Sequence, residues 1–226
     1  MNSNIIAHCI IRGNAIVLNG KVIYQQDDKS MNLEEFLTTV YRRWEINYPK
    51  FHKMDLLSKL AFITAEKLMK MGSINPQDLA IVLSNKSSSI ISDITYQKSI
   101  QHADNYFPSP AVFVYTLANI MVGELCIKHK IAGENIVFIT KEFEIDSVMD
   151  YTNILLENNL CKTCLCGRIE VSNEDEYEAF FYVVEKEYAL DFIFHKMPHN
   201  TTMINQLYHQ PIATKQPAEN IDVAVL

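Results

Sequence analysis

The sequence predicts an α/β fold in which helices flank a mixed, mostly parallel sheet. Two short apolar runs, 79–83 and 136–139, are rich in β-branched residues and bounded by polar or glycine-containing turns, as is typical of strands covered on both faces. Stretches with helical character lie beside and between these runs. Strands that alternate with helices along the chain favour an α/β architecture.

Two hairpins are expected to add antiparallel strands to this sheet. The first surrounds the tight-turn dipeptide Asn19-Gly20 and covers residues 5–11, 15–18 and 21–24. The second surrounds the acidic turn 173–176 and covers residues 168–171 and 177–184. These two hairpins are the reason that the predicted sheet is mixed.

Two further helices are predicted, one before and one after the strand 136–139. Apolar residues recur at helical intervals over 55–71, where Asp55 can cap the start and Gly72 can end the helix. Residues 146–158 are expected to form another helix, which leads into the second hairpin.

The stretch 111–130 is apolar almost all round, and it is predicted to be one long buried helix. A membrane span is the competing interpretation, because the apolar part is near the lower length limit for crossing a bilayer. Asn119 and Glu124 are costly in hydrocarbon, so the buried helix is favoured and no membrane span is expected.

The pattern weakens after Lys186. We predict one domain over residues 1–186 and a C-terminal extension or tail over residues 187–226, with an extended end after His209. The run 188–194 is unusually apolar for a solvated tail, which indicates that the extension wraps a partner.

Charge excludes one class of partner. The chain of 226 residues carries a formal net charge of -7 at pH 7, whereas nucleic-acid binding depends on clustered Lys and Arg. The first twelve residues lack a basic segment, and His8 interrupts their apolar run, so they do not resemble a secretory signal. We therefore expect a cytoplasmic protein that does not bind nucleic acid.

Three of the five cysteines cluster as Cys161, Cys164 and Cys166. Such a run could bind zinc or an iron–sulfur cluster, but these sites need about four ligands, and no second pair of Cys or His follows at a suitable spacing. We predict no metal and no cofactor. The three thiols are expected to be buried where a helix leads into a strand.

An ordered series of short motifs occupies the middle of the chain. The motifs are Ser109-Pro110, Tyr115-Thr116-Leu117-Ala118-Asn119, Gly123-Glu124 and Gly133-Glu134-Asn135, followed by the run 136–139. The series resembles the SP, YTLPN, GE and GPN motifs in the N-terminal half of β-ketoacyl synthases of the thiolase superfamily, and weaker matches at 51–61 and 80–85 precede it in the same order. The resemblance implies a thiolase-like half-fold over about residues 48–184.

The resemblance also implies where a nucleophilic cysteine should lie. In the family it follows the strand that matches 136–139, at the start of a helix, and the matching position here is Glu142. A carboxylate cannot carry an acyl chain as a stable thioester, so no catalytic residue is predicted. Substitution here resembles chain length factors, the cysteine-free partners of ketosynthases, although those usually carry Gln.

A complete ketosynthase has a second half that supplies two histidines and a lysine, and we expect no such half here. His195, His199 and His209 are expected to be ordinary polar residues of the extension. His52 and His129 stand beside lysines and are predicted to be solvated groups at helix ends.

Two further sets of residues are candidates for binding. By position in the family, the first set reaches across a dimer interface towards the partner's acyl tunnel, although burial alone would give the same apolar pattern; it contains Val112, Phe113, Tyr115, Thr116 and Asn119. The second set is basic in an acidic chain and is a candidate contact for an acidic acyl carrier protein; it contains Arg42, Arg43, Lys50 and Lys53.

The sequence thus predicts a non-catalytic, chain-length-factor-like subunit. It would pair with a complete β-ketoacyl synthase in fatty acid, polyketide or aryl polyene-type synthesis, and a self-dimer is the alternative assembly. Two other functions stay open. The chain could decarboxylate or hydrolyse a carrier-bound thioester with Glu142 as a base, or it could bind an acyl chain without chemistry.

Overall fold

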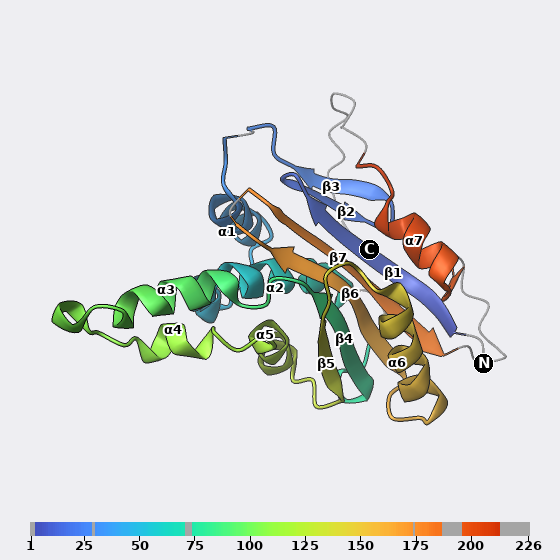
Figure 1. Ribbon diagram of the computed structural model, residues 1–226. Helices are drawn as coiled ribbons and strands as arrows, with labels where there is room; N and C mark the ends of the chain where they lie inside the picture. The colour runs from blue at the N-terminus through green and yellow to red at the C-terminus, as the bar shows by residue number, and fades with distance from the viewer. Residues whose placement is uncertain (1–2, 29, 71–73, 174, 187–195, 213–226) are drawn as a thin grey trace.

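The computed structural model describes residues 3–28, 30–70, 74–173, 175–186 and 196–212 (Figure 1). These residues form an eight-stranded sheet in the order β3-β2-β1-β7-β6-β4-β5, and β8 pairs with β1. The strands are β1 (Ser3–Arg12), β2 (Ala15–Leu18), β3 (Lys21–Gln25), β4 (Leu79–Asn85), β5 (Asn135–Ile139), β6 (Thr163–Val171), β7 (Tyr177–Lys186) and β8 (Met197–Pro198).

Both predicted hairpins and the mixed character of the sheet are confirmed, but the sheet is not mostly parallel. β4 runs parallel to β5 and to β6, whereas all other described pairs are antiparallel. The reason is the connections: short turns join β1 to β2, β2 to β3 and β6 to β7, and short turns can only join antiparallel strands. β1 then pairs with β7 and joins the two hairpins in one sheet.

Helices cover both faces of the sheet. α1 (Leu33–Arg43), α2 (Leu56–Leu68) and α5 (Ile120–His129) share one apolar core with it. α6 (Ile145–Glu157) and α7 (Thr201–Tyr208) share the core on the other face. α3 (Ile90–Ile100) and α4 (Pro110–Val114) project away from the sheet as an arm (Figure 1).

The two helices predicted beside the strand 136–139 are present. The side chain of Asp55 accepts a hydrogen bond from the Ser58 N–H and caps α2, as expected. α2 ends at Leu68, and the predicted stop at Gly72 lies outside the described residues. The helix predicted over 146–158 is α6.

The single buried helix predicted over 111–130 is wrong. The stretch forms α4 and α5, and the chain turns between them, where the N–H groups of Tyr115 and Thr116 donate to the carbonyls of Val112 and Phe113. No residue of α4 is buried, and Phe113 is 53% exposed. Among the described residues, no helix is long and apolar enough to cross a membrane.

Part of the predicted extension packs on the domain. β8 pairs with β1 at Asn4 and Ile5, and α7 buries Ile204 and Leu207 against the sheet. The run 188–194, for which we predicted contact with a partner, lies outside the described residues.

Candidate functional site

A pocket of about 330 Å³ lies at the carboxyl ends of the parallel strands. Residues that follow or end β4, β5 and β6 line it together with residues of β1 and β7. We call it the strand-end pocket; its lining residues are Arg12, Lys86, Lys141, Glu142, Arg168, Glu170, Ser172, Glu176, Tyr177 and Glu178. β5 and β6 lie on opposite sides of β4, and open α/β sheets bind ligands at the carboxyl ends beside such a point.

A chain of hydrogen bonds fixes the turn that carries Glu142. Arg168 is 4% exposed, and its guanidinium lies 3.3 Å from Ser84 Oγ, which lies 2.9 Å from Thr140 Oγ1. The Thr140 hydroxyl donates to the Glu142 carbonyl at 2.7 Å. The polar groups of this turn are therefore paired with the sheet, while the Glu142 side chain stays exposed in the pocket.

Glu178 is held by three donors. Its carboxylate accepts from Arg12 at 3.1 Å, from Arg168 at 3.2 Å and from the Tyr208 hydroxyl at 2.6 Å. Burial and the hydrogen bond to Glu178 raise the pKa of Tyr208 to about 12, so the tyrosine stays a proton donor. Arg12 also donates to the Tyr208 carbonyl. These contacts fasten α7 to the sheet beside the pocket.

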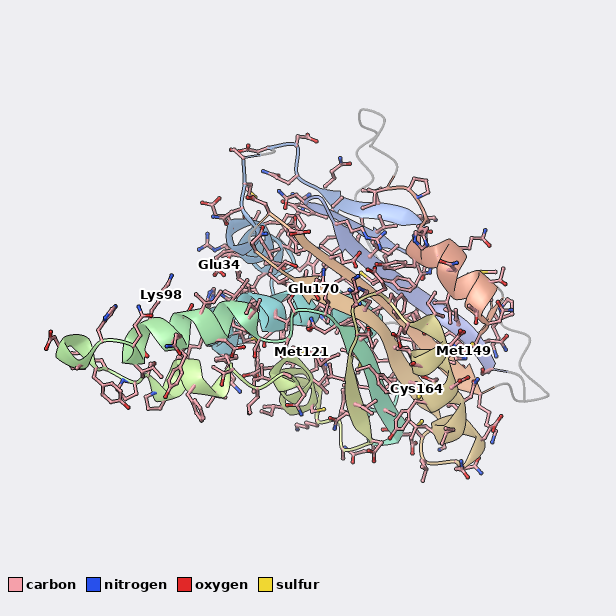
Figure 2. All side chains as sticks on the ribbon, viewed as in Figure 1. Glu34, Lys98, Met121, Met149, Cys164 and Glu170 are labelled. Atoms are coloured by element: carbon pink, nitrogen blue, oxygen red, sulfur yellow. The ribbon has the colours of Figure 1, made fainter. Side chains whose placement is uncertain are left out.

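Glu170 organises the turn that follows β4. Its buried carboxylate accepts from the backbone N–H groups of Lys86 and Ser87, and from the Ser172 hydroxyl at 3.3 Å. Figure 2 shows Glu170 and Cys164 towards opposite ends of β6. Because these partners use the Glu170 carboxylate, the exposed charged groups left for a ligand include Lys86, Lys141 and Glu142.

No thiol lines the strand-end pocket. All five cysteines are described, and Cys126 lies on α5, where burial raises the pKa of its thiol. The position that the family resemblance assigns to the nucleophile is thus occupied by Glu142, an exposed carboxylate.

The five candidate tunnel residues are not core residues. Phe113 and Asn119 are exposed, and Val112, Tyr115 and Thr116 are partly buried. Val112 and Tyr115 line a second pocket of about 300 Å³ between the arm and the start of α2, which we call the arm pocket. Its mostly apolar lining also includes Met54, Leu56 and Ile91.

The four candidate carrier-binding residues have different surroundings. Arg42 and Arg43 are exposed at the end of α1, and Arg43 lies over the Tyr24 ring. Lys53 lines the arm pocket. Lys50 makes an ion pair with the buried carboxylate of Glu124, so much of its charge is already used within the protein.

Among the described residues, no group of three or more His, Cys, Asp or Glu side chains is arranged to hold a metal ion. Cys161, Cys164 and Cys166 are all buried, as predicted; Cys161 lies between α6 and β6, and the other two lie within β6.

The histidines differ from the expectation in one case. His52 is exposed, but the side chain of His129 is only 13% exposed and lies 3.9 Å from Glu66, so His129 is not a solvated group. His209 is exposed, His199 contacts Ser3, and His195 lies outside the described residues.

Sequence reasoning missed Arg12, Arg168 and Glu178, which converge from three neighbouring strands. One signal was available. Arg168 and Glu170 are charged residues inside a strand whose nine residues are all buried, and charged side chains are rarely buried unless they are paired.

No protein-family model matches the sequence, and no curated protein matches it. Solved structures do match. A chain of the ishigamide ketosynthase/chain length factor is 12% identical, with a TM-score of 0.62, and the match covers 84% of this chain and 64% of that chain. For the ketosynthase ApeO in complex with its chain length factor ApeC, from Xenorhabdus doucetiae, the identity is 13%, the TM-score 0.55, and the coverage 84% and 81%.

A third structure, the type II polyketide synthase complex AntDE:AntF, in which an acyl carrier protein is in complex with its ketosynthase, is 13% identical with a TM-score of 0.57. The match covers 82% of this chain and 62% of that chain, so this chain spans less than two thirds of the ishigamide and AntDE chains. The resemblance seen in the sequence is therefore confirmed as a likeness of fold, and the chain has the thiolase-like fold of ketosynthases and chain length factors.

Proposed function

We propose that the chain is a non-catalytic, chain-length-factor-like subunit that pairs with a complete β-ketoacyl synthase. The observation that carries this proposal is the strand-end pocket, in which Glu142 stands where the family resemblance places the nucleophilic cysteine and no thiol is present. A subunit without a nucleophile has to leave acyl transfer to a partner. The ApeO–ApeC structure, a ketosynthase in complex with its chain length factor, is a precedent for such a pair.

Exposed apolar surface on the arm supports association. Phe107 is 75% exposed, and Phe113, Val114 and Leu117 are also exposed. Large apolar side chains gathered in this way are costly in water and mark interaction surfaces. β5 ends the sheet order, so its outer edge has no strand partner among the described residues, and Ile139 at its end is exposed.

Within the pair, the arm would shape the space in which the acyl chain grows. Val112 and Tyr115 already line the arm pocket, and its apolar lining suits a hydrocarbon chain. Phe113 and Thr116 lie on the same segment and would face the partner. The system served would be fatty acid, polyketide or aryl polyene-type synthesis in the cytoplasm.

An acyl carrier protein is the third proposed component. Arg42, Arg43 and Lys53 are exposed cations on a chain with a net charge of -7, and acidic carriers would be attracted to them. Lys50 contributes less, because it is paired with Glu124. Charge reversal of Arg42 and Arg43 should weaken carrier binding, and unchanged affinity would remove the carrier contact from the proposal.

Co-expression with a tagged ketosynthase encoded beside this chain tests the pairing. The wild-type chain should co-purify with the ketosynthase, and Phe113→Asp should reduce the amount recovered. Ile154→Asp is the matched control, because Ile154 is also about half exposed but lies on α6, away from the arm. Failure of the wild-type chain to co-purify, or equal losses in both variants, would contradict the proposed interface.

Intact mass after incubation with acyl and malonyl carrier thioesters tests the missing nucleophile. We expect no acyl adduct on this chain, whether alone or with the ketosynthase. A stoichiometric adduct would show that the chain is catalytic. Release of carbon dioxide by the chain alone, abolished in Glu142→Gln, would instead support the decarboxylase alternative, and a lipid retained in native mass spectrometry would support the binding module.

A further inference from the structure

The cysteine cluster is not used by the proposed function. Cys161 follows α6, and Cys164 lies at the start of β6, where it pairs with Ala80 of β4 (Figure 2). The Sγ atoms of Cys161 and Cys164 are 3.3 Å apart, and both thiols are free. A disulfide bond is about 2.05 Å long, so the two sulfur atoms need to approach by little more than 1 Å to become bonded.

The two thiols differ in their surroundings. Cys164 is enclosed in the sheet, whereas Cys161 is 5% exposed and stands between the exposed residues Leu160 and Lys162. Cys161 lies in the short segment between α6 and β6, outside both elements. A small local movement can therefore expose Cys161 to a small molecule without opening the sheet.

Hydrogen bonds prepare Cys161 to react as a thiolate. The Cys164 thiol donates to it and the Ala80 N–H donates to it, and these contacts lower the pKa of Cys161. Burial acts against these hydrogen bonds at Cys161 and does not outweigh them, whereas at two other thiols burial acts alone: it raises the pKa of Cys9 to about 12 and also raises that of Cys126. Because the thiolate is the reactive form, Cys161 should be oxidised before Cys9 and Cys126.

We propose that Cys161 and Cys164 form a peroxide-reactive dithiol that closes to a disulfide. Cys161 gives its proton to solvent, and its sulfur attacks one oxygen of hydrogen peroxide. The O–O bond breaks, and hydroxide leaves and is protonated to water, so Cys161 becomes a sulfenic acid. The Cys164 sulfur then attacks Cys161, the S–O bond breaks, and a second water leaves. The two thiols lose two electrons in total, and these reduce one peroxide to two waters.

Cys166 is the neighbouring thiol that could compete for Cys161. Cys166 lies on the same face of β6 as Cys164 and contacts its thiol, and the Cys166 sulfur also lies 3.1 Å from Thr152 Oγ1 on α6. The new bond would join the segment that follows α6 to β6 and restrict movement at the end of α6 farther from Glu142. Amide hydrogen exchange over residues 158–162 should therefore slow on oxidation.

The test is intact mass spectrometry of the full chain after treatment with hydrogen peroxide. The wild-type chain should lose the mass of two hydrogen atoms and regain it with a reductant. Trypsin cuts after Lys162, so tandem mass spectrometry of the cross-linked peptides can assign the bond to Cys164 rather than Cys166. Cys126→Ser should show the same loss, because Cys126 lies on α5, away from the cluster.

Two variants separate the steps. Cys161→Ser should not show the mass shift. If this variant melts at a clearly lower temperature than the wild-type chain, Cys161→Ala is used in its place. Cys164→Ser should stop at the sulfenic acid, which dimedone traps on the peptide that contains Cys161. The proposal is overturned if peroxide oxidises Cys126 while the wild-type chain forms no disulfide, or if the mapped bond does not join Cys161 to Cys164.

Discussion

Lys50 Nζ lies 2.7 Å from Oε2 of Glu124, a carboxylate whose side chain is 3% exposed. The Tyr115 hydroxyl donates to the other carboxylate oxygen at 2.9 Å. Burial and this hydrogen bond raise the pKa of Tyr115. Glu124 therefore joins the short helical turn before α2 to the turn between α4 and α5. Its two partners were predicted from the sequence to have different roles: Lys50 in carrier binding and Tyr115 at the acyl tunnel.

The first prediction concerns this ion pair. Lys50→Met should lower the free energy of unfolding by about 1–3 kcal/mol, because it leaves Glu124 buried with only the tyrosine as a partner. Urea denaturation measures the change. Lys53→Met is the control, since no ion pair is described for Lys53, and it should change stability by less than about 0.5 kcal/mol. Glu124→Gln combined with Lys50→Met should cost less than the sum of the two single changes.

The second prediction concerns acid pH. Burial lowers the pKa of His199 to about 4, whereas an unfolded histidine titrates near 6.5. Between these values the unfolded chain binds a proton that the folded chain does not, so stability is full above pH 6.5 and falls as the pH falls towards 4.

His199→Asn should remove this part of the pH dependence. Between pH 7.5 and pH 5, the wild-type chain should lose about 1–2 kcal/mol more than the variant in urea titrations. His52→Asn, which makes the same substitution at an exposed histidine, is the variant against which the slope of His199→Asn is compared. Equal slopes in all three proteins would mean that His199 titrates alike in both states.

The third prediction concerns the strand-end pocket. Arg168→Met removes the donor to Glu178 and to Ser84, and it should lower the free energy of unfolding by about 2 kcal/mol. Tyr208→Phe removes a single hydroxyl donor from the same carboxylate and should cost about 1 kcal/mol. The reverse ranking in thermal or urea denaturation would show that α7, rather than the sheet, holds Glu178.

The fourth prediction compares two glycines. Gly167 has a φ of +147°, and a Cβ there would lie 1.9 Å from the Phe180 carbonyl oxygen, so Gly167→Ala should cost more than about 3 kcal/mol. Gly123 lies within α5, and its Cβ would meet only Ile120 Cδ1, at 4.0 Å. Gly123→Ala should therefore be neutral or stabilise by up to about 1 kcal/mol. Both are measured by urea denaturation, and a tolerated Gly167→Ala would contradict the described β6–β7 pairing.

Much of the fold could be predicted because its signals are local. The runs 79–83 and 136–139 are strands, since continuous β-branched sequence suits a sheet that is covered on both faces. The prediction of one helix over 111–130 was wrong, because an apolar sequence does not reveal whether the core of the same protein or the surface of another molecule covers it. The Phe113 side chain is apolar, as is typical of a core residue, but it is exposed, as is typical of an interface residue.

The rest depended on sheet order, which no local pattern contains. Arg12, Arg168 and Glu178 meet only because β1 pairs with β7 and β7 pairs with β6. The place of Glu142 came from a family resemblance, but its pocket of charged side chains required the fold. α1 and α7 were not predicted either, and α7 lies in a region whose sequence pattern is weak.

The pairing of β1 with β7 also sets the order in which the chain can mature on the ribosome. β1 emerges first, yet its central partner, Tyr177–Lys186, is made only after nearly all of the described domain. Until then the nascent chain has one hairpin with an open strand edge and a group of helices whose sheet is incomplete. Such long-range pairing slows folding and leaves an aggregation-prone intermediate, so this protein should depend on chaperones during synthesis more than its size suggests.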